Sequence, residues 1–131
     1  MKHGLSSLRA FLQKTLCCQI PLRFWSGVRY PHPIGIVIGD GVRIGKGVRI
    51  YQNVSIGLHA NMAGATPSDY PTLGDNVFVY AGAVIIGGIT IGRDSIVAAN
   101  AIVSRDVPPD SIAFGYNQFK PKRRDTSSQV E

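Results

Sequence analysis

Residues 35–56 read GIVIGDGVRIGKGVRIYQNVSI, and an aliphatic residue returns at every sixth position of this stretch. After one interruption the same period resumes at residue 73 and continues to residue 103. A six-residue repeat of this kind is typical of a solenoid β-helix, in which each hexad adds one short strand to a stack of coils. The inward-facing positions predicted in this way are Ile38, Ile44, Ile50, Ile56, Leu73, Val79, Ile85, Ile91, Val97 and Val103.

A second column of small or β-branched residues follows four positions after each of these aliphatic residues, and it supports the same register. Its members are Val42, Val48, Val54, Ala60, Val77, Ala83, Ile89, Ser95, Ala101 and Val107. Because one coil can bury its apolar interior only against its neighbours, the repeats should share one core and need a cover at each end. The N-terminal helix and the C-terminal segment are the natural covers.

Three residues after each inward aliphatic residue, the pattern predicts a corner of the coil. Nine of these ten positions hold Gly, Asn or Asp, which accept a positive φ at little cost. The predicted fold is therefore an all-β, parallel β-helix with triangular coils. The corner positions are Gly41, Gly47, Asn53, His59, Asn76, Gly82, Gly88, Asp94, Asn100 and Asp106.

The segments outside the repeat suggest three parts: residues 1–30, the β-helix over 31–110, and residues 111–131. Leucines recur at helical spacing from Leu5 to Leu16, which predicts a short amphipathic helix ending before Pro21. This helix could pack on the body of the protein, on a neighbouring subunit, or on a membrane surface. Residues 119–131 are basic and then polar without periodicity, and are expected to form a mobile tail.

Composition narrows the class of protein. The chain has 131 residues and a net charge of +6, which favours an anionic partner. Its two cysteines, Cys17 and Cys18, are adjacent and predict neither a disulfide framework nor a metal site. No apolar run reaches the roughly 18 residues of a membrane span, and no clear signal peptide is present. We therefore expect a cytoplasmic protein.

The repeat motifs resemble those of serine acetyltransferases and their polysaccharide-modifying relatives. The resemblance rests on Gly35–Asp40, on the Ile-Gly-x-Gly-Val runs and on Ser104–Pro109, and covers about residues 31–110. It implies a left-handed β-helix that forms a homotrimer, binds acetyl-CoA between adjacent subunits and needs no metal.

His32 breaks the repeat, because counting back six residues from Ile38 gives a histidine where the pattern calls for an aliphatic residue. The resemblance places the catalytic histidine three residues before the Gly-Ile-Val-Ile-Gly motif, and this position is His32. An imidazole can accept the proton of an attacking hydroxyl. Alternatively, His32 is only a residue of the first coil between two prolines. The family's acidic neighbour is replaced by Pro31, so another group must orient the ring.

The second break is an insertion of eleven residues between the hexads at Ile56 and Leu73, which predicts a loop over residues 61–72. In the resembling family this loop carries a second active-site histidine, and Tyr70 stands in its place here. His59 just before the loop is either a corner residue in a left-handed conformation or a contact to the acceptor. We therefore expect Tyr70 and His59 to bind the acceptor substrate.

For acetyl-CoA, the resemblance places Ala81 and Ala99 against the pantetheine, Ser104 and Arg105 further along the cofactor, and Lys122 at its nucleotide end. Cations such as Lys122 suit phosphate recognition. The alternatives are that the alanines are small only for the repeat, and that the basic cluster of residues 120–124 is a solvated tail.

These features predict an acetyl-CoA-dependent O-acetyltransferase. A sugar hydroxyl of a surface polysaccharide or its precursor is the expected acceptor, because the chain has no room for the large helical domain of serine acetyltransferases and because Tyr70 replaces a histidine. L-Serine is the alternative acceptor, and a non-catalytic scaffold is the alternative class. A γ-class carbonic anhydrase is disfavoured, because its zinc would need three histidines in one site. Nucleic-acid binding is disfavoured as well, because it would need aromatic residues among the basic ones.

Overall fold

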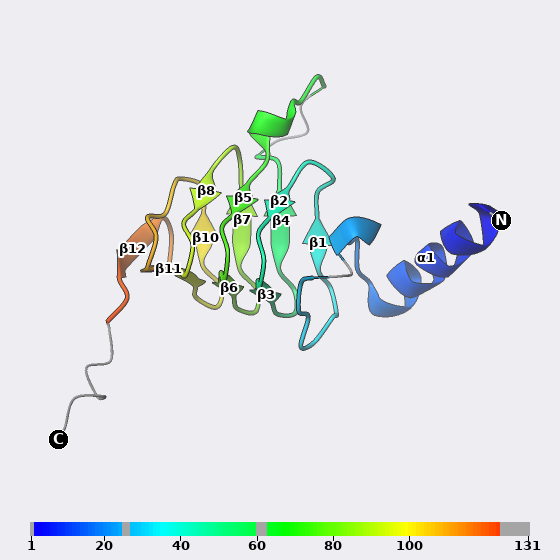
Figure 1. The fold of residues 1–131 in the computed structure, drawn as a ribbon, viewed down its shortest axis with the longest axis horizontal. Coiled ribbons are helices and arrows are strands. Elements are labelled where there is room, and N and C mark those ends of the chain that lie inside the picture. Colours follow the sequence, from blue (N-terminus) through cyan, green and yellow to red (C-terminus); the bar gives the residue numbers. More distant parts are fainter. Residues whose placement is uncertain (1, 25–26, 60–62, 124–131) are drawn as a thin grey trace.

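The computed structural model describes residues 2–24, 27–59 and 63–123, and short strands in it stack into one β-helix (Figure 1). Helix α1 (Lys2–Leu16) lies beyond one end of the stack and a 3₁₀ turn (Leu22–Phe24) follows it. The strands are β1 (Val37–Ile38), β2 (Arg43–Ile44), β3 (Arg49–Ile50), β4 (Ser55–Gly57), β5 (Thr72–Leu73), β6 (Phe78–Val79), β7 (Val84–Ile86), β8 (Thr90–Ile91), β9 (Ile96–Val97), β10 (Ile102–Val103), β11 (Ser111–Phe114) and β12 (Gln118–Pro121).

The strands form three sheets, one for each side of the triangular coil. Sheet A has the order β1-β4-β7-β10, sheet B the order β12-β11-β9-β6-β3, and sheet C the order β2-β5-β8. In each coil the chain passes from sheet A to sheet C and then to sheet B, so we name the turns the A–C, C–B and B–A corners. The strands pair in parallel except for β11 and β12, which are antiparallel. The predicted parallel β-helix is confirmed.

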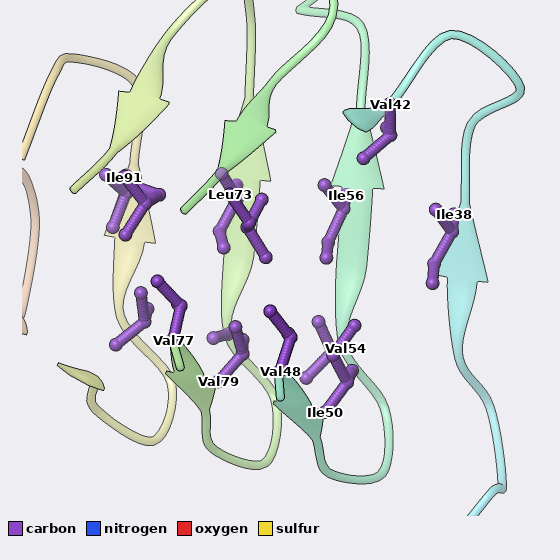
Figure 2. Packing of buried hydrophobic residues seen from close by; sticks show 14 of the residues in the cluster. Ile38, Val42, Val48, Ile50, Val54, Ile56, Leu73, Val77, Val79 and Ile91 are labelled. Carbon is purple, nitrogen blue, oxygen red and sulfur yellow. The ribbon is translucent and has the colours of Figure 1, made fainter. Parts of the chain in front are cut away.

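The core consists of the two predicted columns of side chains. Nine of the ten inward aliphatic residues are buried, and Ile44 on the edge strand β2 is half-buried. Every described member of the second column is buried as well, while Ala60 lies outside the described residues. Figure 2 shows these side chains in layers between the sheets. The hexad register is therefore confirmed along the repeat.

The corner prediction is confirmed at two corners of the triangle and wrong at the third. Positive φ occurs at Gly47, Asn76 and Asp94 on the C–B corner, and at Asn53, Gly82 and Asn100 on the B–A corner. The four positions on the A–C corner are not among the described residues with a positive φ; they are Gly41, His59, Gly88 and Asp106. The insertion leaves the coil at this corner, and it packs against two of these positions.

The N-terminal end of the core is covered by residues 18–24 and 27–30, and not by helix α1. Cys18, Ile20 and Phe24 are buried, and backbone bridges join residue 19 to β1 and residue 29 to β3. The Tyr30 hydroxyl donates a hydrogen bond to the Phe24 carbonyl over 2.9 Å, and burial raises the pKa of Tyr30 well above its usual range. The helix predicted near residues 5–16 is present, but its predicted role as a cover is wrong, because α1 points away from the stack (Figure 1).

The C-terminal segment is more ordered than predicted. Residues 118–121 form β12, which pairs with β11, and the Lys122 amide donates to the Asp110 carbonyl over 2.7 Å. The expected mobile tail is therefore wrong for residues 119–122, and residues 124–131 lie outside the described part. Within the described residues, no helix is long and apolar enough to cross a membrane.

Candidate active site

His32 lies on the outer surface of the B–A corner and is exposed. Its predicted inward position is wrong, because Tyr30 occupies the inward place of this first coil and packs on the core. Eight positions separate Tyr30 from Ile38, whereas six separate Ile50 from Ile56. The two extra residues move the imidazole outward, where it can meet a ligand.

The backbone around His32 is held from two directions. Pro31 and Pro33 restrict the chain on either side, and the Ile34 amide donates to the His32 carbonyl over 2.8 Å. From inside, the buried Cys18 thiol donates to the Pro33 carbonyl at 3.2 Å, and its sulfur accepts the Ile36 amide hydrogen at 3.4 Å. The imidazole is thus presented from a fixed segment.

Two tyrosines continue from His32 along the B–A corner. The rings of His32 and Tyr51 have centroids 6.4 Å apart and are tilted by 50°, and Tyr51 stacks on Tyr80 at 5.0 Å with 21° between the ring planes. Sequence reasoning missed both tyrosines. The signal was present, because Tyr51 and Tyr80 each directly follow an inward residue of sheet B, in successive coils.

The alanines expected to line the pantetheine follow on the same corner. Ala81 is half-buried and Ala99 exposed, and they lie in neighbouring coils joined by the Asn100 amide and the Ala81 carbonyl, 2.9 Å apart. Gln52 is next to Ala81 in the preceding coil, and its Oε1 is buried without a hydrogen-bond partner in the part of the chain that the structure describes. At roughly 4.8 Å for each coil step, the stripe from His32 to Ala99 is about 15 Å long.

The two expected acceptor residues lie at a different corner. Tyr70 is half-buried and packs against the A–C corner, where a Cβ on Gly39 would lie 2.9 Å from its ring and a Cβ on Gly41 would overlap it. His59 is exposed at the same corner, near Gly87 of the next coil. Sheet A separates this corner from the one that holds His32. One chain therefore brings Tyr70 and His59 to one edge of sheet A and His32 to the other.

The described part of the inserted loop ends in a short 3₁₀ turn, Pro67–Asp69. The Asp69 carboxylate accepts hydrogen bonds from the Thr66 amide at 2.7 Å and from the Thr66 hydroxyl at 2.9 Å. These hydrogen bonds, led by the one from the backbone, hold the pKa of Asp69 below its usual range. The turn directly precedes Tyr70, so the ionised carboxylate helps to set where Tyr70 lies.

This arrangement predicts a pH dependence of the turn. Because the pKa of Asp69 is lowered in the folded loop, its contribution to loop order is present above the usual carboxyl pKa of about 3.9 and is lost as the pH falls through the lowered value. A carboxyl-detected NMR titration should give an Asp69 midpoint below about 3.9, and amide exchange at Thr66 should accelerate over the same range. Asp69→Asn should remove that pH-dependent change. A midpoint at or above the usual value would contradict this account.

The remaining cofactor candidates are engaged within the chain. The Asn117 side chain binds the amide and hydroxyl of Ser104, both at 2.7 Å, and the Arg105 guanidinium donates to the Asn117 carbonyl at 2.6 and 3.1 Å. The Lys122 ammonium donates to the Asp94 carbonyl over 2.7 Å on the C–B corner. The structure therefore does not bring Lys122 to the stripe that begins at His32. Within the described residues, no group of three or more His, Cys, Asp or Glu side chains gathers.

Comparison with known proteins gives the same family from sequence and from structure. A family model for the bacterial transferase hexapeptide (six repeats) matches residues 70–105. The serine acetyltransferase of Mycobacterium tuberculosis is 40% identical over 84 residues, which cover 64% of this chain and 35% of that protein. The serine acetyltransferase of Staphylococcus xylosus is 34% identical over 125 residues, covering 86% and 56% respectively.

Among solved structures, the serine acetyltransferase of Neisseria gonorrhoeae superposes with a TM-score of 0.65 at 32% identity, over 75% of this chain and 37% of that one. The predicted left-handed β-helix is thereby confirmed. The chain spans about a third to just over half of the length of the curated relatives it matches. These relatives favour the alternative acceptor, L-serine, over the sugar hydroxyl that the sequence led us to expect.

Proposed function

Because the chain belongs to the hexapeptide-repeat acyltransferase superfamily, we propose that it transfers an acetyl group from acetyl-CoA to a hydroxyl group, with His32 as general base. The observation that supports this most is the outward imidazole of His32 at one end of the stripe that leads to Ala81 and Ala99. A fixed base beside a path of small side chains is the arrangement that such a transfer needs.

In the proposed reaction, His32 accepts the proton of the acceptor hydroxyl while the hydroxyl oxygen attacks the thioester carbonyl. The tetrahedral intermediate then collapses, the C–S bond breaks, and the imidazolium returns the proton to the departing thiolate. No acyl-enzyme is required, because binding both substrates at one site supplies the orientation. Pro31 replaces the acidic neighbour, and Tyr51, whose ring centroid lies 6.4 Å from that of His32, is the candidate for holding the ring.

Acetyl-CoA would lie with its pantetheine along Ala81 and Ala99, whose small side chains leave the backbone accessible. The half-buried Gln52 side chain lies beside this path, and its unpartnered Oε1 would have to turn outward to accept an amide N–H of the pantetheine. Ser104 and Arg105 follow β10 toward the A–C corner, so they would meet a cofactor on the stripe from the A–C corner of a neighbouring copy. Lys122, with Lys120 and Arg123 beside it, has the charge that suits phosphates. Its ammonium lies on the C–B corner against the Asp94 carbonyl, so its role at the nucleotide end rests on charge and not on its place beside the stripe.

The placement of these groups supports the proposed homotrimer. His32 is on the B–A corner, whereas Tyr70 and His59 are on the A–C corner across sheet A. A site that uses both sets needs the A–C corner of a second copy beside the B–A corner of the first. A cleft between adjacent subunits meets this need.

A cytoplasmic location is part of the same proposal, because the reaction needs a supply of acetyl-CoA.

L-Serine is the proposed acceptor, because the relatives with 34–40% identity are serine acetyltransferases. A sugar hydroxyl is the second candidate, and the stacked pair Tyr51 and Tyr80 beside His32 favours it. Two half-buried phenol rings next to the base offer a flat apolar platform. A sugar ring can lie on such a platform, whereas the small side chain of serine gains little from it.

An assay of thioester cleavage tests both whether the chain transfers acetyl groups and which acceptor it uses. We expect release of CoA thiol from acetyl-CoA to depend on L-serine, and calorimetric titration should show acetyl-CoA binding. Release with a nucleotide sugar instead would establish the second candidate. In that case Tyr51→Ala should raise the KM for the sugar, while Tyr116→Ala, on a tyrosine that is 67% exposed, should not. Absence of acetyl-CoA binding up to about a millimolar, above typical KM values, would contradict the proposal and leave a scaffold.

A further inference from the structure

Helix α1 turns its polar side toward the β-helix. The groove between α1 and the first coil is lined on the helix side by Ala10, Gln13 and Lys14, and on the other side by Val37 of β1. At 3.6 residues per turn, Ala10 and Gln13 lie on the side of the helix opposite to Leu8 and Phe11. A helix that packs on its own domain shows the reverse arrangement, with the apolar stripe inward.

The apolar side of α1 is left uncovered. Leu8 is 56% exposed and Phe11 is 64% exposed. Sequence positions 5, 12 and 16, all leucine, fall on the same half of the helical wheel. The sequence of the 15-residue helix therefore forms a continuous apolar stripe, and its two described members, Leu8 and Phe11, are exposed.

The charge around this stripe has one sign. The helix itself, residues 2–16, contains three Lys or Arg and no Asp or Glu. Lys14 lies at one border of the apolar stripe, and sequence positions 2 and 9, both basic, lie at the other. Basic residues at the borders of an apolar stripe are the pattern of helices that lie in a membrane interface.

We propose that α1 binds an anionic lipid surface, with its apolar stripe among the acyl chains and its basic borders at the headgroups. A second copy of the helix is a poorer partner, because it brings the same positive charge and no carboxylate to pair with it. The short helix lies in the interface and does not cross the bilayer, which needs about 20 apolar residues. The proposal goes beyond acetyl transfer, because it concerns where the enzyme works.

Sedimentation of the full chain with vesicles tests this inference without either substrate. Binding is expected to vesicles of equal parts phosphatidylglycerol and phosphatidylcholine, and to weaken in phosphatidylcholine alone and at high salt. The double variant Leu8→Ser/Phe11→Ser should bind at least about tenfold more weakly, since two large apolar side chains leave the interface. Lys14→Gln should weaken binding to the anionic vesicles by about fivefold.

The matched control is Ala10→Ser/Gln13→Ser, which makes two changes on the groove side of the same helix and should bind as the unaltered chain does. Failure of the unaltered chain to bind anionic vesicles would overturn the proposal. Equal binding by Leu8→Ser/Phe11→Ser would also overturn it and would assign the contact to another basic segment. A fall in oligomeric mass of that variant by light scattering, without vesicle binding by the unaltered chain, would assign the stripe to a second copy.

Discussion

Replacing His32 with alanine is expected to lower kcat for acetyl transfer by about 10²–10⁴-fold, the usual contribution of a positioned general base. Acetyl-CoA should still bind with similar affinity, because the imidazole lies at one end of the stripe and is not among the small residues proposed to line the pantetheine. The measurement is acceptor-dependent thiol release together with calorimetric titration of acetyl-CoA. The β-helix should stay intact, because the side chain of His32 is exposed.

His59→Ala is the matched control, since it removes an exposed histidine on the opposite edge of sheet A. It should change the KM for the acceptor more than kcat if His59 only contacts the acceptor. Full activity of His32→Ala would remove His32 from the role of base. A large loss of kcat in His59→Ala instead would move that role to the A–C corner.

Ile85→Ala is expected to lower the free energy of unfolding by about 2–5 kcal/mol, because it leaves a cavity in the middle of the stack. Ile85 is fully buried and pairs in register with Ile56 on one side and Val103 on the other. Both neighbours are held in their own coils, so the cavity has little room to collapse. Urea unfolding at a fixed protein concentration gives the value, because an oligomer's stability depends on concentration.

The control for this substitution is Ile102→Ala in the next coil of the same sheet. Its side chain points outward and is 40% exposed, so the expected loss is below about 1 kcal/mol. Equal losses for Ile85→Ala and Ile102→Ala would mean that inward and outward positions are not distinguished, and would contradict the assigned register.

The repeat could be predicted from the sequence because its cause is local. Each hexad must place one aliphatic residue inward, so every coil carries the same period. The prediction of inward residues fails only at the ends of the repeat, whereas the prediction of a positive φ fails along the A–C corner. At the N-terminal end, the spacing from Tyr30 to Ile38 is two residues longer than in the other coils, so counting back six from Ile38 puts His32 on the wrong side of the coil. At the C-terminal end, residues 118–121 show no periodicity and still pair, because β11 offers them a free edge.

The candidate site could be predicted from the sequence where a motif identifies a residue. It could not be predicted where contacts between coils determine which side chains lie together. The motif identified His32 as the candidate, but only the stacking of successive coils placed Tyr51 and Tyr80 beside it. The repeat predicts a positive φ at the glycines at positions 41 and 88. The structure gives another reason for their small size, since Tyr70 and the Ser68 carbonyl lie where their Cβ atoms would be. Such reasons depend on the loop's path, which no local pattern contains.

Strand β12 limits how far molecules can associate along the coil axis, because it runs antiparallel to β11. A stack of parallel coils ends in unpaired strand edges, and such edges can recruit the next molecule and extend into a fibre. Strand β12 covers the last edge of sheet B with a strand of opposite polarity, on which another coil of the same kind cannot continue the parallel hydrogen-bond pattern. Deleting residues beyond 117 would therefore expose this edge, and molecules joined in pairs at their C-terminal ends would be expected, because the backbone bridges at residues 19 and 29 still cover the N-terminal end.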